Sequence, residues 1–471
     1  MGQRISKNRH AIFNLISRYE DMLEKGQVFF SEERHYHELM DYYEREYLLE
    51  RALEVAGHAI GQYGYSFDFY LRQAELFLEK QEVEQAMAAL DKADALSPGQ
   101  IQSALLRAEC FAALDMHDDG IALLDGLKII SDPIELSRIY VCEAVIHEDL
   151  KEHEHSFYLL KAALEEDPSN TDALSRMWFC VESARKHEES VVLHEKILDE
   201  DPFNALAWYN LGAAHHYLCH YEEAIEAYEY AYLTKDDFEF AYRDCAEVCL
   251  YVENYQKALQ CYQDVLERFE PDADLFLHIG LCFQKLGNYI VAKTFYQKAL
   301  SLDCHCDEAH FRIGECWASQ LEWHKAIGAY LKAIRIEDRN EDYFARLAEA
   351  YFKTGNFKKA EIYYRQAADT APEEPQHWIL LVRFLMQRQR IEDALDALDE
   401  AGENSYSPEF LYFRSACLFE MGMKQEGLLV LEEALYEDFD AREALFMLAP
   451  VLEKDAEVRA VIAVFQPENE G

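Results

Sequence analysis

Large apolar and small side chains recur along this chain at an interval of 34 residues. The pattern is clearest in residues 205–238, where Leu211, Ala224, Tyr228 and Ala231 occupy positions 7, 20, 24 and 27 of the interval. Most steps between successive copies are 34 residues long, with two residues added in one step and one lost in another. A fixed period of this length predicts an array of structural repeats.

Position 20 is the most uniform position of the array. It holds a small residue in all twelve copies, as it must where two helices cross so closely that a larger side chain would separate their backbones. The twelve residues are Ala52, Ala86, Gly120, Ser156, Ser190, Ala224, Ala258, Ala292, Ala326, Ala360, Ala394 and Gly427.

The copy at 205–238 resembles the tetratricopeptide repeat (TPR), a helix-turn-helix unit of 34 residues. Trp208 falls at position 4, Gly212 at position 8 and Ala224 at position 20, and Pro202 closes the preceding copy at position 32. The resemblance implies an all-α fold, a right-handed superhelical solenoid of stacked helical hairpins. At position 8 the glycine is replaced in places by alanine, Met40, Trp178 or Val382; we expect those units to pack less regularly.

The domain organisation follows from the extent of the array. Residues 33–441 form twelve TPR-like repeats, and we expect one solenoid because stacked repeats contact only their neighbours. Residues 1–32 are predicted to form a capping helix, since Leu15 and Tyr19 lie on one apolar helical face. Residues 442–465 are predicted to cap the other end, and 466–471 to form a frayed tail.

The chain is strongly acidic, with a formal net charge of −45 from 90 acidic and 45 basic residues. Nucleic acid and anionic membrane surfaces are therefore disfavoured as partners, because both require a positive surface. Solubility alone is an alternative reason for such a charge.

Twelve cysteines are present, and five of them share repeat position 10, inside the first helix: Cys110, Cys180, Cys282, Cys316 and Cys417. Such regularity indicates packing, since free cysteine behaves as a small apolar residue. Reduced thiols and the lack of a secretory signal predict a cytoplasmic protein.

Catalytic signatures such as GxxxxGK[ST], GxSxG and HExxH are missing from the sequence, so we expect no enzymatic activity and no cofactor. Two groups of metal-binding residue types lack a complete ligand set by spacing: Cys304-His305-Cys306, and the trio of His215, His216 and His220. We therefore predict no metal site.

By resemblance to the family, positions 2, 5, 9, 12 and 13 of the first helices line the concave surface and bind partner segments. Position 9 is acidic in six of twelve copies, where about two would be expected from 90 acidic residues in 471. The acidic candidates for partner binding are Glu75, Glu109, Glu247, Glu315 and Glu349. Solvation of an open groove and recognition of a basic partner are both open explanations.

Apolar candidates are interleaved with these acids at positions 5 and 12: Tyr209, Leu277, Phe311 and Phe352. Each could instead contact the neighbouring repeat. The family also uses a Lys, Asn and Arg clamp for a C-terminal carboxylate. Arg312 and Arg346 come nearest to one here, but Glu315 and Glu349 stand beside them, so local salt pairing is the preferred interpretation.

The function predicted from these residues is that of a non-enzymatic scaffold or adaptor, which binds a basic and aromatic segment of another protein in an acidic groove. The alternative is a structural protein that self-associates as a homo-oligomer, or that anchors to a membrane. The opening Met-Gly-Gln-Arg-Ile-Ser fits the spacing of an N-myristoylation signal, which Arg4, Lys7 and Arg9 could assist.

Overall fold

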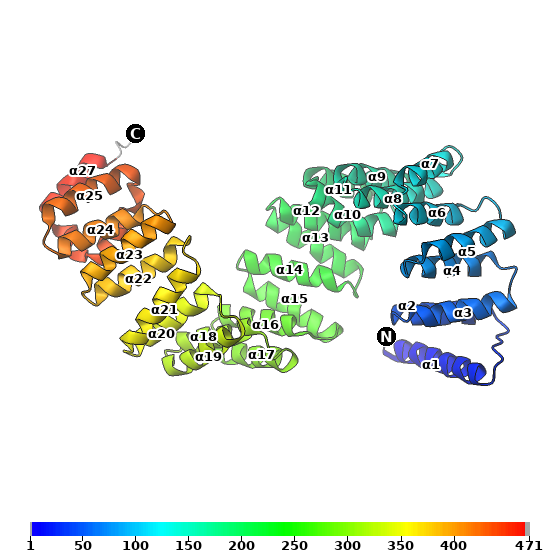
Figure 1. The fold of residues 1–471 in the computed structure, drawn as a ribbon, viewed down its shortest axis with the longest axis horizontal. Helices are drawn as coiled ribbons and strands as arrows, with labels where there is room; N and C mark the ends of the chain where they lie inside the picture. The colour runs from blue at the N-terminus through cyan, green and yellow to red at the C-terminus, as the bar shows by residue number, and fades with distance from the viewer. Residues whose placement is uncertain (1, 467–471) are drawn as a thin grey trace. The chain divides into compact units, whose positions relative to one another are not determined.

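The computed structural model describes residues 2–466, and the side chains from Ile12 onward. The residues of the possible myristoylation signal, with Arg4, Lys7 and Arg9, therefore fall outside the part whose side chains are described. Of the predicted tail, residues 467–471 also fall outside the described residues. Figure 1 shows that the described chain is helical, with 27 α-helices and no strand among its residues. The predicted all-α fold of stacked helical hairpins is confirmed.

Twelve hairpins follow one another between Arg34 and Glu437 in the described part of the chain. Their first helices are α2 (Arg34–Arg45), α4 (Phe67–Glu79), α6 (Ile101–Ala113), α8 (Pro133–Asp149), α10 (Thr171–Ala184), α12 (Ala205–Tyr217), α14 (Glu239–Tyr251), α16 (Ala273–Lys285), α18 (Asp307–Ser319), α20 (Glu341–Lys353), α22 (Pro375–Gln387) and α24 (Glu409–Glu420). Their second helices are α3 (Leu49–Gln62), α5 (Val83–Leu96), α7 (His117–Lys128), α9 (His153–Glu166), α11 (His187–Glu200), α13 (Tyr221–Thr234), α15 (Tyr255–Arg268), α17 (Tyr289–Leu302), α19 (Trp323–Ile336), α21 (Phe357–Thr370), α23 (Ile391–Asn404) and α25 (Lys424–Glu437).

The small residues at position 20 lie where the two helices of a hairpin approach each other. All twelve side chains or glycines at this position are buried. The facing position 8 is equally constrained: a Cβ built on Gly280 would lie 2.5 Å from Cε1 of the fully buried Tyr296. Glycine at 8 therefore makes room for the tyrosine ring at position 24.

Hairpins with a large residue at position 8 are looser, whereas those with Ala144 or Ala348 are as close as the glycine hairpins, so the expectation holds for the large replacements and is wrong for these alanines. In the hairpin of α10 and α11, Trp178 is 47% exposed instead of lying between the helices. Helix α10 packs on α9 and α12 rather than closely on its own partner. The hairpins that carry Met40 and Val382 also approach less closely than those with Gly212 or Gly280. A large side chain at position 8 thus accompanies a looser hairpin, but it is not the only determinant, because the hairpin of α6 and α7 is no closer although it has Ala108 at this position.

Every hairpin turn contains a left-handed residue at repeat position 15. Three of the twelve are glycines, Gly287, Gly355 and Gly422, with φ between +77° and +79°. The other nine are non-glycine residues with φ between +55° and +63°: Tyr47, Gln81, Asp115, Lys151, Arg185, Cys219, Glu253, Leu321 and Gln389. The turn geometry is therefore imposed by the hairpin and not by the residue in it.

Asparagine side chains begin several helices at two repeat positions. The Oδ1 atoms of Asn204 and Asn340, at position 34, accept hydrogen bonds from the first turns of α12 and α20 at 3.0 and 3.1 Å. Asn288, at position 16, caps α17 in the same way at 3.4 Å. Such caps satisfy backbone N–H groups that the helix cannot pair internally.

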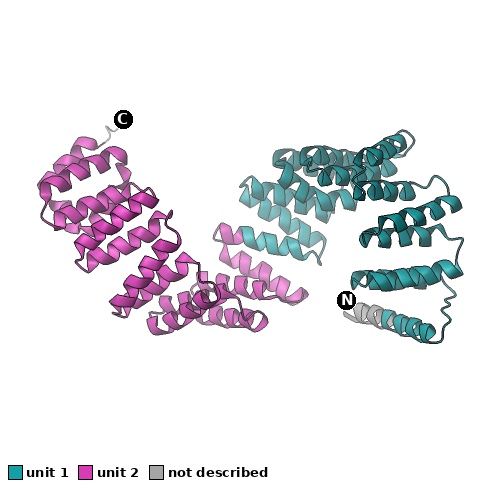
Figure 2. Cartoon of the chain, viewed as in Figure 1, with its two compact units in different colours: residues 1–248 teal, residues 249–471 magenta. Residues whose placement is uncertain are grey.

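The chain divides into two compact units, residues 1–248 and 249–471, shown in different colours in Figure 2. The predicted single solenoid stays a prediction. In the first unit, helix α1 (Gly2–Glu24) buries Leu15 and Tyr19 against α2 and α3. In the second, α26 (Glu443–Leu448) and α27 (Ala456–Phe465), with 3-10 turns at Asp440–Arg442 and Pro450–Lys454, bury Leu445 and Val458 after α25.

A buried histidine lies in the core of the first unit. His194 of α11 is fully buried; its Nδ1 donates to the carbonyl of Ser190 at 2.8 Å, and Asn210 Nδ2 of α12 donates to its Nε2 at 3.3 Å. Both ring nitrogens are satisfied by the neutral form. Burial lowers the pKa of His194 to about 4, because the imidazolium would lose its hydration.

Candidate partner-binding groove

First helices carry the predicted partner-binding positions, and their side chains line pockets in both units. In the first unit a pocket of about 530 Å³ lies among α4, α6, α8 and α10; we call it the α6–α8–α10 pocket. In the second unit a pocket of about 430 Å³ lies between α20 and α22, the α20–α22 pocket. The residues lining both pockets come mainly from positions 2, 5, 6, 9 and 13 of first helices.

The α6–α8–α10 pocket brings together two of the predicted glutamates, Glu75 and Glu109. Burial raises the pKa of Glu109, while Arg176 of α10 opposes that rise and Glu75 adds to it. Glu109 forms no ion pair with any described side chain. Arg176, the nearby cation, is paired with Glu148 instead, at 3.2 Å. Glu109 is thus a half-buried carboxylate still able to receive a cation from a partner.

The α20–α22 pocket contains the predicted Glu349 and Phe352 together with three cationic side chains, Arg346, Lys353 and Arg383. Lys353 and Arg383 form no ion pair among the described residues. His377 also lines the pocket; it is 7% exposed, and its Nδ1 lacks a hydrogen-bond partner within the described part of the chain. An unpaired buried polar atom typically costs about 1–3 kcal/mol. A polar group of a bound partner would remove that cost.

Two arginines at position 6, Arg72 and Arg346, pair with position-9 carboxylates, which the sequence predicted for Arg346 but not for Arg72. Arg72 bonds to Glu75 of its own helix at 2.8 Å and to Asp41 of the preceding first helix at 3.0 Å. Arg346 repeats this with Glu349 at 3.2 Å and Glu315 at 3.9 Å. Each arginine therefore joins position-9 carboxylates of consecutive repeats.

This pairing divides the five predicted glutamates. Glu75, Glu315 and Glu349 are bound to arginines of the chain itself, and Glu315 also accepts a hydrogen bond from the Tyr330 hydroxyl. Glu109 and the exposed Glu247 have no such partner in the described residues. The local salt pairing expected for Arg312 is present too, to Glu308 at 3.0 Å.

Three of the four apolar candidates pack within the array. Tyr209 contacts Phe238 with ring centroids 5.0 Å apart, and its hydroxyl donates to Asp244 Oδ2 at 2.6 Å. Burial raises the pKa of Asp244 to about 6, although this hydrogen bond lowers it. Phe311 stacks on Tyr343 of the next hairpin at 4.5 Å. These contacts favour the alternative role, packing on the neighbouring repeat.

Leu277 and Phe352 complete the apolar set. Leu277 is partly buried in the cluster that joins α16, α17 and α18. Phe352 lies near Phe357 and Phe384, with centroid distances of 5.7 and 5.9 Å, and also faces the α20–α22 pocket. Phe352 is the apolar candidate with a place in a described pocket.

Two exposed aromatic side chains lie on α10, and the tryptophan at position 8 was not a predicted site residue. Trp178 and Phe179 are 47% and 49% exposed and lie edge to face at 5.9 Å. They follow Ser175 and Arg176, which line the α6–α8–α10 pocket. The large residue at position 8 was the signal: a tryptophan that cannot enter the hairpin must be placed outside it.

The five position-10 cysteines are fully buried, as their packing interpretation requires. The suspected metal-binding groups offer two ligands each at close range: His215 Nδ1 lies 3.4 Å from His220 Nδ1, and Cys304 Sγ lies 3.2 Å from His305 Nδ1. Within residues 2–466, no helix has the length and apolar character needed to cross a membrane.

Sequence comparisons identify related proteins over parts of the chain. It is 22% identical over 165 residues to anaphase-promoting complex subunit 6 of Arabidopsis thaliana, and 22% identical over 264 residues to the TPR repeat-containing protein YpiA of Bacillus subtilis. The matches cover 34% and 47% of this chain. They span 30% and 61% of those relatives, so the chain matches less than two thirds of either.

Solved structures with a similar fold include YrrB, described as a TPR protein with an unusual peptide-binding site, and the anaphase-promoting complex assembly Cut9-Hcn1. YrrB is 22% identical with a TM-score of 0.33, covering 39% of this chain and 95% of YrrB. The Cut9-Hcn1 match is 11% identical with a TM-score of 0.38, covering 93% of this chain and 97% of the other.

Family models described as tetratricopeptide repeat match residues 273–303 and 345–408. Both segments fall in frame with the hairpins α16–α17 and α20–α23. The same small residues, turns and caps recur in the other hairpins. The chain is therefore a tetratricopeptide-repeat protein.

Proposed function

We propose that the protein is a non-enzymatic scaffold or adaptor that holds a segment of another protein against its first helices. The observation that carries the proposal is the recurrence of groove pockets at the same repeat positions in both units. Two similar proteins are named as subunits of the anaphase-promoting complex, a role that depends on contacts between proteins. We further propose a cytoplasmic location. Burial raises the pKa of the Cys110 thiol to about 11, so this thiol stays protonated and unreactive there.

The charge of the proposed partner segment follows from the carboxylates that remain unpaired. Glu109 in the α6–α8–α10 pocket and Glu247 on α14 are suited to a Lys or Arg of the partner. The exposed pair Trp178 and Phe179 offers apolar contact beside that pocket. Buried apolar anchors would supply most of the affinity, since exposed ion pairs contribute only about 0.2–1 kcal/mol each.

The α20–α22 pocket suits a different part of a partner. Lys353 and Arg383 favour an anionic group there, and the unpaired Nδ1 of His377 can donate or accept a hydrogen bond according to its tautomer. A segment that used this pocket would therefore carry an acidic side chain. The proposed specificity is basic in the first unit and acidic in the second.

A photo-crosslinking amino acid at position 175 tests the proposal, because Ser175 is exposed and lines the α6–α8–α10 pocket. The matched control is the same amino acid at position 192, since Val192 is 68% exposed on the second helix α11. We expect crosslinks to a basic partner segment from position 175 alone. Equal crosslinking from both positions, or none from 175, would contradict the proposal.

Charge reversal separates recognition from mere proximity. Glu109→Lys should weaken binding of the crosslinked partner by about tenfold or more, because it places a cation where the partner's cation would lie. Glu226→Lys, on the exposed face of second helix α13, makes the same charge change away from the pocket. Binding that both variants weaken equally would indicate a general charge effect instead of recognition by Glu109.

A further inference from the structure

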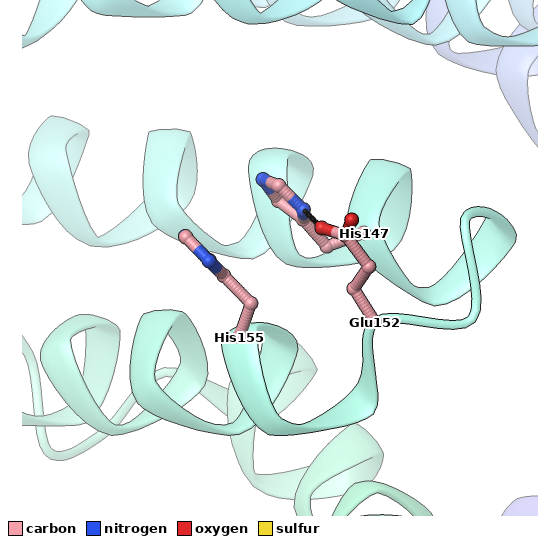
Figure 3. Close-up of side chains that lie close together, drawn as sticks. All are labelled: His147, Glu152 and His155. Atoms are coloured by element: carbon pink, nitrogen blue, oxygen red, sulfur yellow. Dashed lines mark hydrogen bonds and ion pairs between the residues drawn. The ribbon is translucent and has the colours of Figure 1, made fainter.

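The turn between α8 and α9 brings three metal-binding side chains together in the first unit. His147 lies in the last turn of α8, Glu152 at the N-cap of α9 and His155 in the first turns of α9 (Figure 3). One candidate ligand atom of each lies within 4.8 Å of those of the other two. The histidines that the sequence pattern pointed to lie elsewhere, and no metal site was predicted from them.

We propose that His147, Glu152 and His155 bind a divalent transition-metal ion, with Zn²⁺ as the best fit. Two imidazoles and one carboxylate form a donor set that zinc accepts with a fourth position left to water. Imidazole nitrogen also suits Cu²⁺ and Ni²⁺, whereas Mg²⁺ and Ca²⁺ require mainly oxygen ligands. The site therefore selects borderline ions over hard ones.

Half of the site is already held in place. His147 is 8% exposed, and its Nδ1 lies 2.8 Å from Glu152 Oε2. Ligand atoms on a tetrahedral zinc ion are about 3.3–3.4 Å apart when each bond is about 2.0–2.1 Å long. A shift of about 0.5 Å thus allows the ion to replace the proton between these two atoms. Glu152 is free to make it, since its side chain is 55% exposed.

His155 must turn to complete the site. Its ring is stacked on that of His147, with centroids 4.2 Å apart and planes 13° from parallel. An ion cannot lie in both ring planes while they are stacked. His155 is exposed, however, so its ring can rotate toward the His147–Glu152 pair without displacing core side chains.

The local charge favours a cation. Residues 147–155 read HEDLKEHEH; Glu148 and Glu154 are paired with Arg176 and Lys186, which leaves the carboxylates at 149 and 152 against the lysine at 151. Clustered carboxylates raise the local concentration of cations around a binding site. The other candidate groups, at His215 and His220 and at Cys304 and His305, offer only two ligands each at close range. The α8–α9 turn is the one trio found in the part of the chain that the structure describes.

Zinc titration of the full chain, read by competition with a chromophoric chelator, tests the proposal. We expect one equivalent to bind to the native sequence and affinity to fall at least about tenfold in His155→Ala, which removes an exposed ligand and leaves the fold unchanged. His220→Ala is the matched control and should retain the native affinity. Binding should also raise the thermal unfolding midpoint of the native chain, because the ion joins α8 to α9 only in the folded state.

Cobalt substitution identifies the donor atoms. Co²⁺ bound by nitrogen and oxygen ligands should give visible d–d bands without thiolate-to-metal charge transfer in the near ultraviolet. Native affinity in His155→Ala, equal losses in His155→Ala and His220→Ala, or a thiolate charge-transfer band would each overturn the assignment. Absence of zinc binding to the native chain would overturn it as well.

Discussion

Single side chains decide how closely two helices of this protein approach. Gly314 of α18 faces Tyr330 of α19, and a Cβ at that glycine would lie 2.5 Å from Cδ1 of the ring. The ring is 1% exposed and cannot move aside without disturbing its neighbours. Overpacking of this kind costs about 1–3 kcal/mol.

Gly314→Ala should therefore lower the free energy of unfolding by about 1–3 kcal/mol, even though alanine is the better helix former. Gly328→Ala is the control: this glycine lies in the partner helix α19 and has nothing within 4 Å of the added Cβ. That substitution should stabilise by about 0.5–1 kcal/mol. Urea denaturation measures both; equal shifts in the same direction would contradict the role given to the tyrosine ring.

The buried His194 predicts a pH dependence. Its pKa is about 4 in the folded protein, against 6.5 for an ordinary histidine, so the unfolded chain takes up a proton at higher pH than the folded one. Stability is thus complete above about pH 6.5 and is lost as the pH falls toward 4. Each pKa unit between the folded and unfolded states corresponds to about 1.36 kcal/mol, so the unfolding free energy falls by about 3 kcal/mol over this range.

His194→Gln removes this titration while other acid-sensitive groups remain. Between pH 7 and pH 4 the native protein should lose about 3 kcal/mol more unfolding free energy than the variant. The comparison of urea midpoints across this range isolates the histidine. Parallel pH profiles for the two proteins would show that His194 is not the residue responsible.

At the scale of elements, the hairpin turn is the recurring source of strain. Leu321 has φ +61° in the turn between α18 and α19, and its side chain is 73% exposed, so little packing depends on it. A left-handed conformation costs a non-glycine residue about 1–2 kcal/mol. Replacing the residue by glycine removes this cost but adds a smaller one, because glycine loses more conformational entropy on folding than leucine does.

Leu321→Gly should raise the unfolding free energy by about 0.5–1 kcal/mol, the difference between these two effects. The reverse change at the equivalent turn, Gly287→Leu, should destabilise by a similar amount, since Gly287 has φ +77°. Both can be measured as thermal midpoints. Destabilisation by Leu321→Gly would show that its side chain contributes packing that outweighs the backbone cost.

The sequence predicted the hairpins well because their determinants are local. A small residue at position 20, such as Ala224, is buried in every hairpin, and the large residue Trp178 loosens its own. The pairing of Arg72 with Asp41 could not be predicted from the sequence, because it depends on how the first helices of consecutive hairpins are placed relative to each other. The trio at the α8–α9 turn was missed because His147, Glu152 and His155 are joined by a turn and share no helical period.

At the scale of the whole molecule, the net charge of −45 acts against the folded state. Raising NaCl from about 0.01 to 0.15 M shortens the Debye length from about 30 to 8 Å. We expect the thermal midpoint to rise over this range, because screening of repulsion among surplus carboxylates outweighs the weakening of exposed pairs such as Arg346 with Glu349. A midpoint that falls with salt would show that ion pairs dominate instead.

Nine of the twelve hairpin turns hold a non-glycine residue in a left-handed conformation. Substituting glycine at these turns, one repeat at a time, would therefore raise the thermal stability of the protein in steps. Because separated sites add nearly independently, an engineer could grade the melting behaviour of chosen repeats while leaving every groove-facing side chain as it is.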